Sequence, residues 1–223
     1  VVGCEDLFGP SARRPVTVGL YENPPKIFTT ETGEPAGLFV EIIEAVARAE
    51  GWRLAYVPCN WNECLTRLEN GEIDLMPDVA FSSERAERFD FHRTSVANSW
   101  SQIYAQPGRI VESITDLNGA RIAMLRGGVQ QDFINQLMSA TGLPFETVLF
   151  DSLEDAYTAV ESGAADVVVT NSFFAARNGH RYKLVESPIV FLPSTLYFAS
   201  AKGRNADLLS AIDVRLLEWR RNS

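Results

Sequence analysis

Arg85 is the residue of this sequence that is best suited to bind an anion. It follows Ser82-Ser83-Glu84, where a serine can cap a short helix and the glutamate lies in the helix's first turn. Ser82 is, with Arg85, a candidate ligand-binding residue. A guanidinium group grips a carboxylate with two parallel hydrogen bonds, which are strong where water is partly excluded. The alternative is an exposed arginine paired with Glu84 or Glu87, and such a pair contributes little.

A turn with two glycines is the second candidate for anion binding. In Leu125-Arg126-Gly127-Gly128-Val129-Gln130 a predicted strand passes through the glycines into a predicted helix. Free backbone N–H groups and the positive end of the helix dipole favour an anion at such a turn. Glycines also serve tight turns that bind nothing, so the pattern alone leaves both roles open.

Aromatic and acidic side chains near these motifs complete the candidate site. Tyr21, Phe28, Phe81 and Trp100 could form the apolar walls of a small-ligand cleft, although core packing is the ordinary role of each. Tyr21 and Phe81 adjoin the other motifs and are favoured. Asn171 follows the predicted strand Val167–Val169, where it could cap the next helix, contact a ligand, or do both.

The sequence offers little support for catalysis, metal binding or nucleic-acid binding. His92 and His180 lie far apart, and no His-x-x-x-His, Gly-x-Ser-x-Gly or phosphate-loop sequence occurs. We therefore expect no catalytic residue, no metal and no cofactor. The net charge of -9 and the pI near 4.8 argue against nucleic acid, because phosphate binding needs a basic face. A small solute is the expected partner.

Cys59 and Cys64 are the candidates for a disulfide. They lie five residues apart, one at the end of a predicted strand and the other in the first turns of a predicted helix. We expect a bridge in an oxidising compartment, with two buried thiols as the alternative. Cys4 follows Val1-Val2-Gly3, which faintly resembles a lipoprotein cleavage box.

The elements that must position these side chains alternate between strands and helices. The first half predicts, in order, strand 16–20, helix 39–48, strand 53–57, a helix of about ten residues from Trp61, and strand 73–76. The second half predicts strand 121–125, helix 131–140, strand 147–150, helix 153–161 and strand 167–169, and a last helix starts at Ala206. Such alternation builds parallel α/β sheets, which bind ligands beyond the carboxyl ends of their strands. The pattern E-x-G-x-x-D occurs once in each half, at 69–74 and at 161–166.

Several of these motifs together resemble the family 3 extracellular solute-binding proteins. They are Gly37–Glu41, Trp61 with Leu68, Gly71–Asp74, Ser82–Arg85 and Phe89–Phe91, and the resemblance runs from about Val16 to Trp219. It implies the type II periplasmic-binding fold, in which two α/β lobes are joined by two hinge crossings and enclose a ligand cleft. The segments 24–28, 74–80 and 166–174 resemble more narrowly the variant fused to membrane-bound sensor histidine kinases or diguanylate cyclases.

The resemblance also implies lobe boundaries and residue roles. Lobe 1 would comprise residues 1–98 and 190–223, and lobe 2 residues 99–189. In related amino-acid binders the arginine that matches Arg85 holds the ligand carboxylate, and the positions of Gly128 and Val129 offer donors to the same group. Those binders carry an aspartate for the ligand ammonium where this chain has Asn171. Either Asp78 or Glu22 therefore meets a cationic group, or the ligand is not an ordinary α-amino acid.

The expected function is an extracytoplasmic sensor domain that binds a small carboxylate or amino-acid-like solute. The basic helical end at 216–223 favours a domain cut from a longer protein. We expect that protein to be periplasmic, tethered to the inner membrane by a segment outside this chain, with a homodimer possible in the full receptor. A solute-binding component of an amino-acid uptake system is the alternative. An enzyme resembling periplasmic cyclohexadienyl dehydratase, with Asp78 or Glu22 as its acid, is a more remote one.

Overall fold

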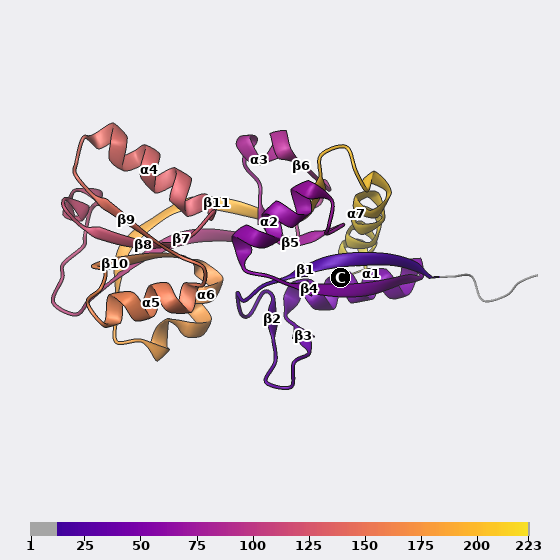
Figure 1. The fold of residues 1–223 in the computed structure, drawn as a ribbon, viewed down its shortest axis with the longest axis horizontal. Helices are drawn as coiled ribbons and strands as arrows, with labels where there is room; N and C mark the ends of the chain where they lie inside the picture. The colour runs from indigo at the N-terminus through magenta and orange to yellow at the C-terminus, as the bar shows by residue number, and fades with distance from the viewer. Residues whose placement is uncertain (1–12, 223) are drawn as a thin grey trace, which may run out of the picture.

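Two lobes lie end to end along the long axis of the molecule in the computed structural model, which describes residues 13–222 (Figure 1). Lobe 1 is built from ten elements: β1 (Arg14–Leu20), β2 (Phe28–Thr29), β3 (Pro35–Ala36), α1 (Leu38–Glu50), β4 (Trp52–Pro58), α2 (Trp61–Asn70), β5 (Met76–Ala80), α3 (Ser83–Arg88), β6 (Phe89–Phe91) and α7 (Ala206–Arg221).

Lobe 2 holds the middle of the chain. Its elements are the 3-10 turn η1 (Ile114–Leu117), β8 (Arg121–Leu125), α4 (Val129–Thr141), β9 (Glu146–Phe150), α5 (Leu153–Glu161), β10 (Val167–Asn171), α6 (Ser172–Asn178) and the 3-10 turn η2 (Gly179–Arg181). The predicted bounds of β8 and α5 agree with the structure, and the other predicted elements of this lobe differ by a few residues. Cys4 lies outside the described residues.

Two long strands connect the lobes. β7 (Ala97–Ala105) and β11 (Val185–Ala201) pair antiparallel, and they form the centre of a sheet with the order β5-β11-β7-β10-β8-β9. β11 pairs with β5 and β6 in lobe 1, and β7 pairs with β10 in lobe 2. The sheet therefore runs through both lobes, and both crossings are strands (Figure 1).

The repeated E-x-G-x-x-D pattern has the same structural role in each lobe. The Asp74 carboxylate accepts a hydrogen bond from the Thr17 backbone N–H at 2.9 Å, and the Asp74 N–H donates to the Thr17 carbonyl. The Asp166 carboxylate accepts from the Arg121 N–H at 2.8 Å, and the Asp166 N–H donates to the Arg121 carbonyl. Each aspartate thus fastens the segment that leads into one strand to another strand: Asp74 to the middle of β1, and Asp166 to the start of β8.

The strand predicted at 73–76 is wrong in its bounds. Ile73 and Asp74 turn out of α2, and β5 begins at Met76 and continues through Pro77 to Ala80. The pairing of β5 with β11 shifts register between Tyr197 and Ala199, opposite Pro77 and Asp78. A proline lacks the N–H of a regular ladder but is tolerated at such a bulge.

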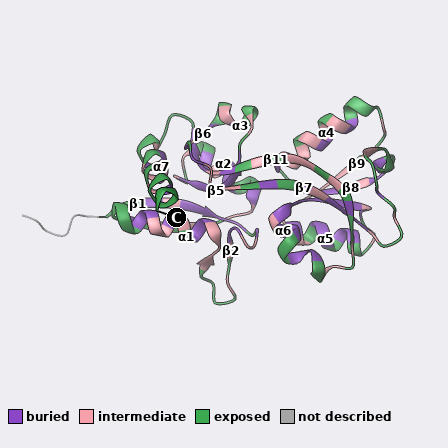
Figure 2. Ribbon diagram, turned by 180° about the vertical axis from the view of Figure 1, so that it is seen from behind, coloured by how far each residue is buried: buried purple, intermediate pink, exposed green. Residues whose placement is uncertain are grey.

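Each lobe has its own apolar core. In lobe 1, residues of β1, α1, α2, β5 and α7 are buried together, and in lobe 2 the core lies among β8, β10, α4 and α5. Figure 2 shows the buried residues concentrated in the strands and on the helix faces that cover them. The predicted disulfide joins Cys59 to Cys64, whose Cα atoms are 5.5 Å apart, so that prediction is confirmed. Within residues 13–222 no helix is long and apolar enough to cross a membrane.

Candidate ligand-binding site

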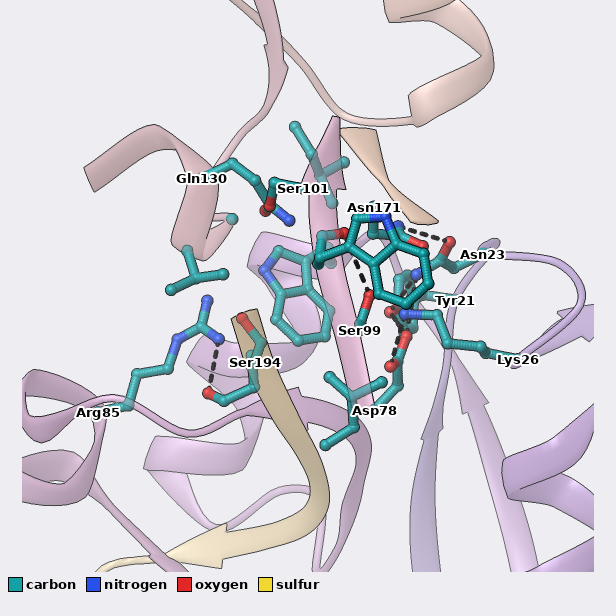
Figure 3. A pocket seen from close by; sticks show the side chains of 17 residues that line it. Tyr21, Asn23, Lys26, Asp78, Arg85, Ser99, Ser101, Gln130, Asn171 and Ser194 are labelled. Carbon is teal, nitrogen blue, oxygen red and sulfur yellow. Dashed lines mark hydrogen bonds and ion pairs between the residues drawn. The ribbon is translucent and has the colours of Figure 1, made fainter. Parts of the chain in front are cut away.

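A small cavity lies between the two lobes, beside the crossing strands (Figure 3). Its volume is about 50 Å³, and its lining comes from both lobes: Tyr21, Asn23, Lys26, Trp61, Asp78, Ala80, Arg85, Ser99, Trp100, Ser101, Leu125, Gly128, Val129, Gln130, Asn171, Ser194 and Leu196. One water molecule needs about 10–15 Å³ of such volume, so the cavity holds roughly four water-sized groups. The cavity suits a small polar molecule.

Asp78 is the acidic centre of the site. It sits in the bulge of β5, with a φ of 61° that aspartate tolerates better than most residues. Its buried carboxylate accepts hydrogen bonds from the Tyr21 hydroxyl, from Asn23 Nδ2 at 2.9 Å and from Lys26 Nζ at 2.7 Å. Burial and the adjacent Asp78 charge raise the pKa of Tyr21 well above its ordinary value, so this phenol stays a donor.

Lys26 brings a buried cation into the same site. Its side chain is 4% exposed, and its ammonium pairs with the fully buried carboxylate of Asp78. The same ammonium lies 5.5 Å from the centre of the Phe173 ring, which belongs to α6 of lobe 2. Lys26 therefore lies where the two lobes meet.

Arg85 lies on the opposite side of the cavity from Lys26 and Asp78 (Figure 3). α3 begins beside it because the Ser82 hydroxyl caps the helix by accepting a bond from the Arg85 N–H at 3.1 Å. The guanidinium donates to the Ala80 carbonyl and to the Gly127 carbonyl, both at 3.0 Å, and lies over the ring of Trp61. Burial lowers the pKa of Arg85 to about 10, so the group stays charged at neutral pH.

The glycine turn closes the cavity from lobe 2. The Gly127 carbonyl accepts from Trp61 Nε1 at 3.0 Å as well as from Arg85, so two lobe 1 side chains hold one lobe 2 carbonyl. Gly128 and Val129 line the cavity. The Gly128 N–H, which was predicted to donate to a ligand, donates within the turn to the Leu125 carbonyl at 3.1 Å.

Asn171 combines the two roles that the sequence left open to it. Its side-chain oxygen caps α6 by accepting from the Phe174 N–H at 3.0 Å, and the residue also lines the cavity. Its amide nitrogen donates across the lobe boundary to Asn23 Oδ1 at 3.3 Å. The side chain thus faces the Asp78 cluster without adding a charge to it.

Three of the predicted ligand-binding residues lie outside the cavity lining. Glu22 is exposed and accepts a hydrogen bond from the Thr29 N–H at 3.0 Å, since successive residues of an extended segment point to opposite sides and Tyr21 takes the inner one. Phe81 is 49% exposed and packs against Phe91, and Ser82 serves as the helix cap. Trp100 does line the cavity, with 46% of its surface exposed.

Sequence reasoning missed most of the polar lining. Asn23, Lys26, Ser99, Ser101, Gln130 and Ser194 were not singled out. Ser99 and Ser101 alternate along β7, which the sequence marked only as a hinge crossing, so their common face was a usable signal. Trp61 looked like a core residue of an amphipathic helix, and it is buried, but its indole N–H also reaches lobe 2.

Comparison with known proteins supports the two-lobed architecture. Residues 16–109 match the family model of bacterial extracellular solute-binding proteins, family 3. A histidine kinase sensor domain with similarity to periplasmic binding proteins superposes with a TM-score of 0.82 and 23% identity, covering 94% of this chain and 92% of that one. The chain has the two-lobed fold of the periplasmic binding proteins. The predicted α/β fold of two lobes is confirmed.

Two further comparisons concern binding proteins. The holo form of ArgBP from T. maritima gives a TM-score of 0.83 and 25% identity, covering 92% of this chain and 90% of that one. The general L-amino acid-binding periplasmic protein AapJ of Rhizobium johnstonii is 27% identical over 145 residues, which are 63% of this chain and 42% of that relative. The chain thus matches less than half the length of AapJ.

Proposed function

We propose that this chain is the extracytoplasmic ligand-binding domain of a membrane-bound signalling protein and that it binds a small carboxylate in the cavity between its lobes. The observation that carries this proposal is the charge of the lining: Arg85 and Lys26 supply two buried cations, and Asp78 supplies one anion. A desolvated guanidinium is a strong partner for a carboxylate.

Binding would be coupled to the arrangement of the lobes. The bonds from Trp61 and Arg85 to the Gly127 carbonyl join the two lobes, so they would favour a closed arrangement over an open one. A ligand that touches both lobes would favour it as well. A ligand shifts the equilibrium only by as much as its affinities for the two arrangements differ. That difference is the signal passed to an output domain.

The sensor role draws support from one comparison. The match to the histidine kinase sensor domain covers nearly all of both chains. The alternative, a component of an amino-acid uptake system, has the same cleft and draws its support from the AapJ and ArgBP similarities. We also propose lobe boundaries near residues 98 and 190, a membrane tether outside this chain, and dimerisation in the full receptor.

The site is better suited to binding than to acid catalysis. An acid catalyst would need a carboxyl group that carries a transferable proton, whereas the Asp78 carboxylate already accepts from three donors. Glu22, the other acid considered, does not line the cavity. We propose that the domain itself turns over no substrate; release of a product from prephenate or arogenate would contradict this.

A thermal-shift screen of short carboxylic acids tests the proposal. A ligand at a hundredfold excess over its dissociation constant stabilises the folded protein by about 2.7 kcal/mol, which is roughly 5–10 °C for a chain of this size. Arg85→Ala should abolish the shift. Arg88→Ala, in the same helix but exposed and paired with Glu69, is the matched control and should keep it. An acid that stabilises Arg85→Ala as strongly as the wild type would refute the site.

A further inference from the structure

We propose that the buried Lys26–Asp78 ion pair makes this cleft selective for carboxylates that lack an α-ammonium group, such as short hydroxy acids. This inference rests on the proposed function, because it names the ligand class of the same cavity. Three observations support it: the hydrogen-bond partners of Asp78, the charge of the cavity lining, and one buried hydroxyl without a hydrogen-bond partner among residues 13–222.

Asp78 has little capacity left for a ligand cation. Its side chain is fully buried, and its two oxygens accept from Tyr21, Asn23 and Lys26. A carboxylate offers about four acceptor positions, so three are occupied by the protein. A ligand ammonium would find only one acceptor position there, and it would lie beside the ammonium that the chain itself supplies.

The remaining lining offers no second anion. Among the described residues around the cavity, Asp78 is the only acidic one, while Arg85 and Lys26 are both cationic. The formal charge of the lining is therefore +1, from two cations and one anion. A zwitterionic amino acid would bring a third cation into this enclosure, whereas an acid with a neutral substituent would bring the charge to zero.

Neutral polar groups occupy the rest of the wall. Ser101 is 1% exposed and lines the cavity, and its hydroxyl has no hydrogen-bond partner within residues 13–222. A buried hydroxyl without a partner is costly, and a ligand hydroxyl or keto oxygen would satisfy it. Gln130 and Ser194 also line the cavity and offer further neutral donors and acceptors.

The first experiment compares isosteric acids on the wild-type protein by isothermal titration calorimetry. The pairs are L-lactate with L-alanine and L-malate with L-aspartate, which differ by a hydroxyl in place of an ammonium. We expect the hydroxy acid of at least one pair to bind at least about tenfold more tightly, because an unpaired buried charge costs more than 1.4 kcal/mol. Equal or tighter binding of both amino acids overturns the selectivity while leaving the carboxylate cleft intact.

The second experiment removes the internal cation. Lys26→Met frees Asp78 to pair with a ligand ammonium, so the ratio of hydroxy-acid to amino-acid affinity should fall at least about tenfold. Lys26→Met/Asp78→Asn removes both charges and should not gain amino-acid binding, which makes it the matched control. A ratio in Lys26→Met equal to that of the wild type overturns the role of the pair.

Ser101→Ala separates the hydroxyl contact from the charge effect. It should weaken L-lactate binding and leave propionate, which lacks the hydroxyl, unchanged. Equal weakening of both acids overturns the assignment of Ser101. If none of these acids binds the wild type, the proposed small-carboxylate function itself fails. If amino acids bind as tightly as hydroxy acids, only the proposed selectivity fails.

Discussion

Replacing Lys26 by methionine should destabilise the protein far more than its single charge would suggest. Methionine preserves most of the buried aliphatic volume but leaves the Asp78 carboxylate, which is fully buried, without its cation. Removing one partner of a buried pair costs about 3–5 kcal/mol. Asp78 keeps the bonds from Tyr21 and Asn23, which places the expected loss near the lower end, at about 3 kcal/mol.

Urea unfolding at pH 7 with a double-mutant cycle measures this effect. Asp78→Asn in the Lys26→Met background replaces the stranded charge by a neutral amide, so the double variant should recover most of the loss, giving a coupling of about 2–3 kcal/mol. Lys26→Met alone should lower Tm by roughly 6–12 °C, at 2–4 °C for each kcal/mol. Arg88→Met is the control, because its pair with Glu69 is nearly half exposed and should be worth less than about 1 kcal/mol.

Two results would refute this reasoning about the buried pair. The first is a loss for Lys26→Met no larger than that of Arg88→Met. The second is a double variant as unstable as Lys26→Met, which would assign the loss to packing of the lysine stem and not to the stranded charge of Asp78.

Three further predictions concern other parts of the fold. Burial lowers the pKa of His92 from 6.5 to about 4, so the free energy of unfolding should fall by about 3 kcal/mol as the pH drops from about 6.5 toward 4. His92→Gln should flatten this dependence of stability on pH, measured by urea titrations. An unchanged dependence would exclude His92 as its source. Cys59→Ser/Cys64→Ser should lower the free energy of unfolding by about 2 kcal/mol in thermal unfolding, as expected for so short a loop. If a reductant left the Tm of the wild type unchanged, this expectation would be contradicted. Trp61→Phe keeps an aromatic ring but deletes the hydrogen bond from the indole N–H to the Gly127 carbonyl, so Kd for L-lactate, measured by calorimetry, should rise about fivefold. An unchanged Kd would show that this bond does not favour closure.

The sequence predicted the elements of the fold better than the lining of the cleft. The alternation of strands and helices follows from local periodicity, and helix ends follow from single residues such as Gly71, which has a φ of 77° at the end of α2. Local rules were sufficient for these features. The strand fastening at Asp74 and Asp166 was not predicted, because its partners Thr17 and Arg121 lie 57 and 45 residues away along the chain.

The partners of Asp78 depend on tertiary placement and could not be predicted. The sequence offered Asp78 to a ligand cation, but the fold brings Lys26 to it from 52 residues away along the chain. No spacing rule links a lysine after a Pro-Pro turn to an aspartate in a β-bulge. Arg85, which the sequence singled out, lines the cavity, and its bonds to the Ala80 and Gly127 carbonyls required the three-dimensional structure.

The paired crossing strands restrict the geometry of any movement between the lobes. β7 and β11 lie side by side, and their ladder shifts register between Glu186 and Val190 and again between Phe191 and Ser194. Leu192, between those last two residues, has a φ of 50°, which a leucine seldom adopts. Two hydrogen-bonded strands resist shear along their length but bend readily across it where the ladder is interrupted. We therefore expect the pair to bend at these interruptions, so that occupancy of the cleft would change mainly one hinge angle between the lobes, which a neighbouring domain could follow.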